Sequence, residues 1–111
     1  MYYLNRMETI AIESGLQIEV LQIKKAALVL RAINHPLRQQ MLRLLHQNKQ
    51  MTVTSIYVKL RLEQSVASQH LAILRKAGFV NTKRDAKFIY YSVNYERLEQ
   101  IHAIAGQLIS Q

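Results

Sequence analysis

The amino-acid sequence predicts a mainly α-helical protein with one small β-hairpin. Apolar residues recur with the helical period of about 3.6 in five segments, whereas residues 79–93 alternate with period two and are rich in β-branched and aromatic side chains. Short polar breaks separate the segments, and 111 residues are about the length of one domain. We therefore expect a single domain over residues 1–111.

The first helix is predicted over about residues 16–33. Ser14 and Gln17 resemble a capping box, so we expect the helix to begin there. Residues 26–33 are apolar on almost every side, which requires cover from the protein's own domain on one side and from a partner chain on the other. The a and d positions of this helix are held by Val20, Ile23, Ala27 and Leu30.

A second helix is predicted to begin at Pro36, because proline fits the first helical turn but disfavours helix in the residue before it. Asn34 or His35 is expected to be its N-cap. Its apolar residues mark one buried face: Leu37, Met41, Leu44 and Leu45.

Residues 53–77 are predicted to form two helices joined by a tight turn at 61–63, which is a helix-turn-helix. Thr52 or Thr54 caps the shorter helix, whose inner face carries Ile56 and Leu60. The longer helix runs from residue 64 to 77 and stops at Gly78. Its inward positions are Ala67, Leu71 and Leu74.

Residues 79–93 form the predicted hairpin, or wing, with the polar segment 83–87 as its tip. Asn94 caps a last helix over about 95–110. The narrow apolar seam of that helix suits a partner helix and consists of Leu98, Ile101, Ala105 and Leu108. The order of elements is that of a winged helix-turn-helix with an additional dimerisation helix at each end.

The net charge of +8 is concentrated in the middle of the chain. Residues 24–87 hold 13 Lys and Arg against only Glu63 and Asp85, a net charge of +11, whereas residues 1–23 and 88–111 carry −2 and −1. A basic segment of this kind favours binding to a polyanion over an ordinary solvated surface.

The outward face of the 64–77 helix carries side chains suited to reading base edges. Glutamine can pair with adenine through two hydrogen bonds, serine is adaptable, and Val66 can meet a thymine methyl group. No acid lies between Glu63 and Asp85 to repel phosphates. The alternative is a plain solvent face on a core helix. The outward positions are Gln64, Ser65, Ser68, Gln69, Ala72 and Lys76.

The wing carries three cations, Lys83, Arg84 and Lys87, which can reach phosphates or a narrow minor groove. A charged edge that discourages sheet aggregation is the alternative, and both roles can hold together.

Residues 27–93 resemble the ArsR/SmtB-type winged-helix transcriptional repressors. The similarity rests on Asn34-His35-Pro36-Leu37-Arg38, on the 64–80 stretch with its Ser68-x-His70-Leu71 run, and on residues 89–93. The resemblance implies a homodimer that binds an inverted-repeat operator in double-stranded DNA and leaves it when an inducer binds. The residues expected to contact DNA are Thr54, Gln64, Ser65, Val66, Ser68, Gln69, His70, Lys76, Lys83, Arg84 and Lys87. The residues expected at the dimer interface are Val20, Ile23, Ala27, Leu30, Leu98, Ile101, His102, Ala105 and Leu108.

The sequence departs from the family pattern at the turns and at the sensing site. Arg61 and Ala86 stand where the family often has glycine, and Glu63 replaces the usual Ser or Asp N-cap. The sensing cysteines of metal-binding members align with Thr52 and Thr54, and the chain has no cysteine at all. We therefore expect no metal and no cofactor, and the inducer stays open.

The histidines give no metal-binding spacing. A pair of His102 side chains across the dimer axis could bind zinc, but we favour a packed interface histidine. His35 is expected to cap a helix, His70 to pack within its helix, and His46 to lie at the surface.

Several function classes are excluded or disfavoured by the sequence. Without cysteine there is no disulfide and no thiol chemistry, the longest apolar run is 26–30, and no secretory signal is recognisable, so we expect a cytoplasmic protein. Ser68-x-His70 is the one close Ser/His pair and is poorly placed for catalysis, so we expect no enzyme. A winged-helix protein-interaction module, or an anti-repressor that does not read DNA, is the alternative function.

Overall fold

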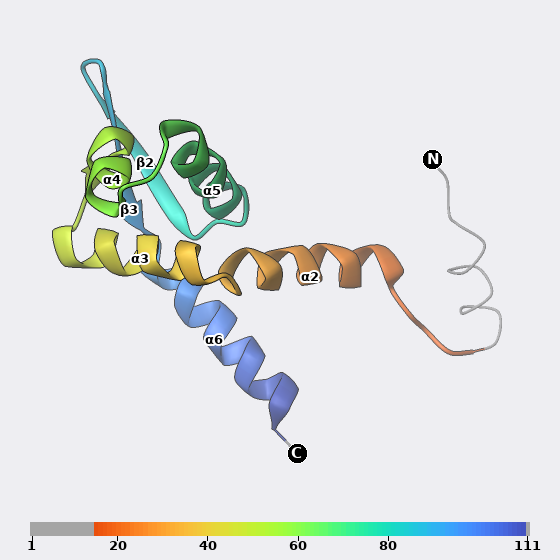
Figure 1. Cartoon of the computed structure of the whole chain (residues 1–111). Helices are drawn as coiled ribbons and strands as arrows, with labels where there is room; N and C mark the ends of the chain where they lie inside the picture. Colours follow the sequence, from red (N-terminus) through yellow and green to blue (C-terminus); the bar gives the residue numbers. More distant parts are fainter. Residues whose placement is uncertain (1–14, 111) are drawn as a thin grey trace.

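The computed structural model describes residues 15–110 and is mainly helical with one small sheet, which confirms the predicted fold class (Figure 1). The regular elements, in chain order, are α2 (Val20–Ile33), α3 (Pro36–Asn48), β1 (Met51–Thr52), α4 (Val53–Leu60), α5 (Gln64–Lys76), β2 (Val80–Asp85), β3 (Phe88–Val93) and α6 (Tyr95–Ile109).

Three side-chain caps fix where helices begin. The His35 Nδ1 atom accepts a hydrogen bond from the Leu37 backbone N–H at 3.1 Å and caps α3. Thr52 Oγ1 caps α4 by accepting from the Ser55 N–H at 3.2 Å, and Asn94 Oδ1 caps α6. The predicted caps are thus confirmed, with His35 chosen over Asn34 and Thr52 chosen over Thr54.

The predicted start of the first helix was wrong. Residues 16–19 have no regular structure, and α2 begins at Val20 after Glu19, whose side chain makes no capping hydrogen bond. Gly15 adopts a φ of +80°, which an α-helix does not allow. A capping box at Ser14 would have required Gly15 in the first helical turn; Ser14 itself lies outside the described residues.

The core forms where α3, α4 and α5 meet the base of the wing. The inward positions predicted for α5, Ala67, Leu71 and Leu74, are at most 1% exposed, and Met41 and Leu45 of α3 are fully buried. These residues recur at helical spacing, so each helix presents one apolar face to the others. The core thereby fixes the inner side of α5 and leaves its opposite side to solvent.

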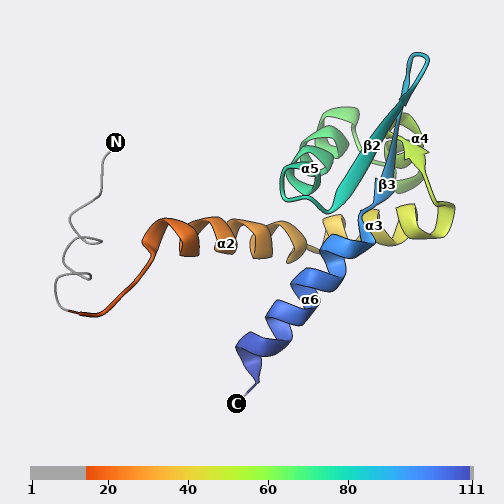
Figure 2. The ribbon, with the colours of Figure 1, turned by 180° about the vertical axis from the view of Figure 1, so that it is seen from behind.

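The sheet differs from the predicted hairpin in two ways. A third strand, β1, pairs with β3, which gives the antiparallel order β1-β3-β2. The predicted tip was also too long, because residues 83–85 belong to β2 and Asp85 pairs with Phe88 across a loop of only Ala86 and Lys87. Polar residues remain in the strand here because the wing extends past the helices, where both faces meet water (Figures 1 and 2).

We predict opposite stability effects at two positions with positive φ. Gly78 ends α5 with a φ of +88°, and a Cβ there would lie 3.3 Å from Arg97 Nε. Ala86 has a φ of +56° at the first position of the two-residue loop, where glycine is usual. Gly78→Ala is expected to destabilise the fold by about 1–2 kcal/mol, and Ala86→Gly to stabilise it by up to about 1 kcal/mol. Urea denaturation measures both, and shifts of the same sign would contradict the prediction.

The two end helices project away from this body. The radius of gyration is 17.8 Å, against about 13 Å for a compact domain of 100 residues. Figures 1 and 2 both show α2 and α6 running out in different directions. Large apolar side chains are exposed along them: Leu21, Ile23 and Leu28 on α2, and Ile104, Leu108 and Ile109 on α6. Exposed apolar surface on this scale marks an interaction face.

Candidate nucleic-acid interface

The solvent side of α5 gathers the polar residues that the sequence predicts there. Because the inner side is fixed by three buried residues, the remaining positions are turned outward. Val66 and His70 are half-buried at the margins of this face. All six predicted outward positions are exposed, namely Gln64, Ser65, Ser68, Gln69, Ala72 and Lys76, and Ile73 and Arg75 of the same helix are exposed as well.

The wing carries its cations on both faces. Lys83 pairs with Tyr90 and Arg84 with Ile89 along β2 and β3, and adjacent residues of a strand point to opposite sides. Arg84 donates from Nε to the Ala86 carbonyl at 3.3 Å. All three predicted wing cations are exposed. They can therefore meet a polyanion from either side of the wing.

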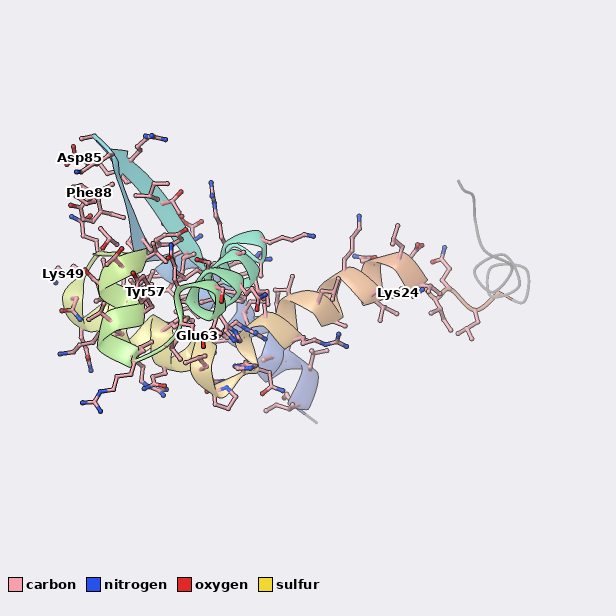
Figure 3. All side chains as sticks on the ribbon, turned by 45° about the horizontal axis from the view of Figure 1, so that its top comes forward. Lys24, Lys49, Tyr57, Glu63, Asp85 and Phe88 are labelled. Atoms are coloured by element: carbon pink, nitrogen blue, oxygen red, sulfur yellow. The ribbon has the colours of Figure 1, made fainter. Side chains whose placement is uncertain are left out.

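An exposed aromatic ring, which the sequence reasoning did not select, completes the wing tip. Phe88 is 47% exposed, and the Lys87 ammonium lies 5.5 Å from its ring centroid. Figure 3 shows Phe88 and Asp85 at the end of the wing, far from Lys24 on α2. The alternation of residues 88–93 was a usable signal, since it places Phe88 on the face opposite to buried Val93.

The most important residue that the sequence reasoning missed is Arg38, which is only 6% exposed. Its Nε donates to the Ala32 carbonyl at 2.6 Å and its Nη2 to the Arg31 carbonyl at 3.0 Å. Its Nη1 lies 3.1 Å from His70 Nδ1. The signal was present, because Arg38 stands three residues before Met41 and seven before Leu45, on the buried stripe of α3.

His70 therefore faces α3. Its ring centroid lies 4.8 Å from that of His35. Burial, then His35, then the Arg38 guanidinium lower the pKa of His70 below its ordinary value of 6.5. Thr54 is exposed in the first turn of α4. Contacts of His70 and Thr54 with DNA stay predictions.

Five of the predicted interface residues meet in one groove between α2 and α6, namely Ala27, Leu30, Ile101, His102 and Ala105. Of the other four, Val20 and Leu98 are half-buried, while Ile23 and Leu108 are 57% and 65% exposed. Ile101 also belongs to the chain's own core at 7% exposure, and Leu98 packs against that core.

The remaining histidines lie apart from one another. His46 is exposed, as predicted, and its Nδ1 lies 2.7 Å from the Tyr95 hydroxyl, while His102 is exposed in the α2–α6 groove. Within residues 15–110 no three His, Asp or Glu side chains gather as a metal site. No helix in that part of the chain has the length and apolar character needed to cross a membrane.

A helix-turn-helix followed by a basic wing defines the class of the protein, a winged-helix DNA-binding transcriptional regulator. The model of the bacterial regulatory protein, arsR family, matches residues 35–82. The transcriptional repressor PagR of Bacillus anthracis is 34% identical over 85 residues, which cover 77% of this chain and 85% of PagR. The chain belongs to the ArsR family.

Two further comparisons agree with this assignment. The transcriptional activator HlyU of Vibrio cholerae is 33% identical over 87 residues, which cover 78% of this chain and 80% of HlyU. The crystal structure of PagR superposes with a TM-score of 0.61 at 32% identity and covers 78% of this chain and 99% of that one. The relatives of the chain thus include a repressor and an activator at similar identity.

Proposed function

We propose that this protein is a homodimeric, sequence-specific repressor that binds an inverted-repeat operator in the cytoplasm. Each subunit places α5 in a major groove, with the two half-sites about one helical turn apart. The wing lies on the adjacent backbone or minor groove, and α2 and α6 join the subunits. Bound at its operator, the dimer blocks transcription until an inducer releases it.

The observation that carries this proposal is the exposed polar face of α5 beside a basic wing. Gln69 and Ser68 offer donors and acceptors for base edges, while Lys76 and the wing cations meet phosphates. No acidic residue lies between Glu63, at the start of α5, and Asp85, at the wing tip. The surface therefore suits double-stranded DNA better than a neutral protein partner.

The exposed end helices support the homodimer. α2 and α6 offer an open groove between them, and apolar side chains run along both. A two-fold interface presents the same patch from both subunits, so one such groove can receive the end helix of a second copy. One relative is named a repressor and another an activator, so the direction of regulation is tested separately. A reporter assay with the operator placed before the reporter gene measures it.

Selection of bound DNA from a random pool tests the proposal, with the mass of the free protein measured by light scattering. We expect an enriched sequence with two inverted half-sites and a dimer mass. Recovery of unrelated sequences, with no gel shift in low salt, would instead favour the protein-interaction module. A monomer mass would overturn the assignment of both end helices.

The wing is expected to supply affinity without sequence preference. Arg84→Ala with Lys87→Ala should weaken operator and scrambled DNA alike. It should also reduce the slope of log affinity against log salt by about 0.9 for each phosphate that the variant no longer neutralises. Lys24→Ala with Lys25→Ala on α2 removes the same charge far from the wing tip (Figure 3) and serves as the matched control. A salt slope unchanged relative to that control would rule out the wing contact.

A further inference from the structure

Arg38 joins three helices at one buried point. The carbonyls of Arg31 and Ala32 lie in the last turn of α2, where an α-helix leaves its carbonyls without internal partners. A guanidinium there satisfies two of them and complements the negative end of the helix dipole. Its third contact, to His70, reaches α5. Arg38 thus links the helix proposed to dimerise with the helix proposed to read DNA.

Both histidines of this cluster act as acceptors through Nδ1. His35 Nδ1 accepts from the backbone N–H groups of Leu37 and Arg38, at 3.1 and 3.5 Å. Arginine has no acceptor, so in the contact of Arg38 with His70 the histidine Nδ1 must accept. Both rings are therefore neutral, with the proton on Nε2. A proton added to either Nδ1 replaces an acceptor with a donor and removes the hydrogen bond.

The charges around the cluster disfavour that proton. Burial, His35 and Arg38 all lower the pKa of His70, and no carboxylate is among these causes. Within residues 15–110, the groups that hydrogen-bond in this cluster are carbonyls from α2, Arg38 and His35 from α3 and its cap, and His70 from α5. Glu63 of the α4–α5 turn is two helical turns before His70, about 10 Å along the axis.

We propose that Arg38 is a positioning residue that holds the recognition helix α5 to α2, and that protonation of His70 in mild acid releases this link and the sequence discrimination that depends on it. The direction follows from the lowered pKa of His70. The folded arrangement favours the neutral ring of His70. The contribution of this ring to the stability of the link is therefore complete above pH 6.5, and it is lost as the pH falls through the lower pKa that His70 has in the folded protein. The proposal rests on the proposed function, because it assumes that α5 reads DNA.

The test is the ratio of affinities for the selected operator and a scrambled duplex, measured between about pH 7.5 and pH 5. The positive charge added in acid strengthens binding to the operator and to the scrambled duplex alike, because phosphate contacts do not depend on sequence. If the link does not matter, the ratio of the two affinities therefore stays unchanged. We expect the operator preference of the natural protein to fall by about tenfold between these pH values, within the range typical of coupling between two sites.

The variant His35→Ser with His70→Asn keeps both acceptors and removes both imidazole rings. Serine is a strong N-cap, and the Asn oxygen accepts from a guanidinium. We expect the operator preference of this variant, whatever its size at pH 7.5, to stay constant across the pH range, whereas His46→Gln should show the same pH dependence as the natural protein. A double variant with the same pH profile as the natural protein would overturn the proposal.

Imidazole nitrogen NMR of the free full chain gives a readout that needs no DNA. At neutral pH His35 and His70 are expected to show an unprotonated Nδ1, and the backbone signals of α5 to shift as His70 titrates. Protonated Nδ1 atoms at neutral pH would contradict the proposal. Absence of operator binding at every pH, combined with the expected NMR result, would overturn the proposed function and retain the link.

Discussion

Replacement of Phe79 by alanine is expected to lower the free energy of unfolding by about 3–5 kcal/mol. Phe79 is fully buried where α5 ends and β2 begins. Its backbone N–H donates to the Leu74 carbonyl at 2.9 Å, and its carbonyl accepts from the Asn94 N–H at 2.9 Å. Loss of the ring leaves a cavity at the junction of the reading helix, the wing and α6. Because several elements surround this cavity, movement of one side chain cannot fill it.

This loss is a large share of the stability of a small domain, which is typically about 5–15 kcal/mol. The chain offers its own control, because it has just two phenylalanines and Phe88 is 47% exposed at the wing tip. Phe88→Ala is expected to change the stability by only about 0.5 kcal/mol. Urea midpoints at one fixed protein concentration measure both variants, since dimerisation makes apparent stability depend on concentration. Equal losses at the two positions would contradict the assignment of the core.

The local parts of the structure were predictable because they depend on neighbouring residues. His35, Thr52 and Asn94 cap helices through hydrogen bonds to backbone groups two or three residues ahead. The buried face of α5 follows from the spacing of Ala67 and Leu71. In each case the periodicity or the cap chemistry is contained within a single element.

The parts that were missed depend on contacts between distant residues. The contact between Arg38 and His70 joins positions 32 apart, and nothing within α3 alone assigns that partner. Strand β1 has only two residues, too few to show a period, and exists because Met51 and Thr52 pair with β3. The capping-box pattern predicted a helix that begins beside Gly15, but the positive φ of Gly15 is incompatible with an α-helix.

The base-reading assignment makes the second large prediction. Ser68→Ala with Gln69→Ala is expected to reduce the preference for operator over scrambled DNA. A bidentate glutamine–adenine pair contributes about 1–3 kcal/mol of discrimination, so the expected loss is about 5- to 150-fold for each half-site. Both side chains are exposed and uncharged, so affinity for scrambled DNA and its salt slope should stay the same.

Loss of folding is not a competing explanation for such a result, because alanine has a higher helix propensity than serine or glutamine. Gln47→Ala near the end of α3 removes a similar exposed amide outside the reading face and should leave the preference unchanged. Full discrimination in the Ser68/Gln69 variant would place base reading on another element. The wing would then be the strongest candidate, because Arg84 and Phe88 at its tip have the charge and apolar surface that minor-groove binding uses.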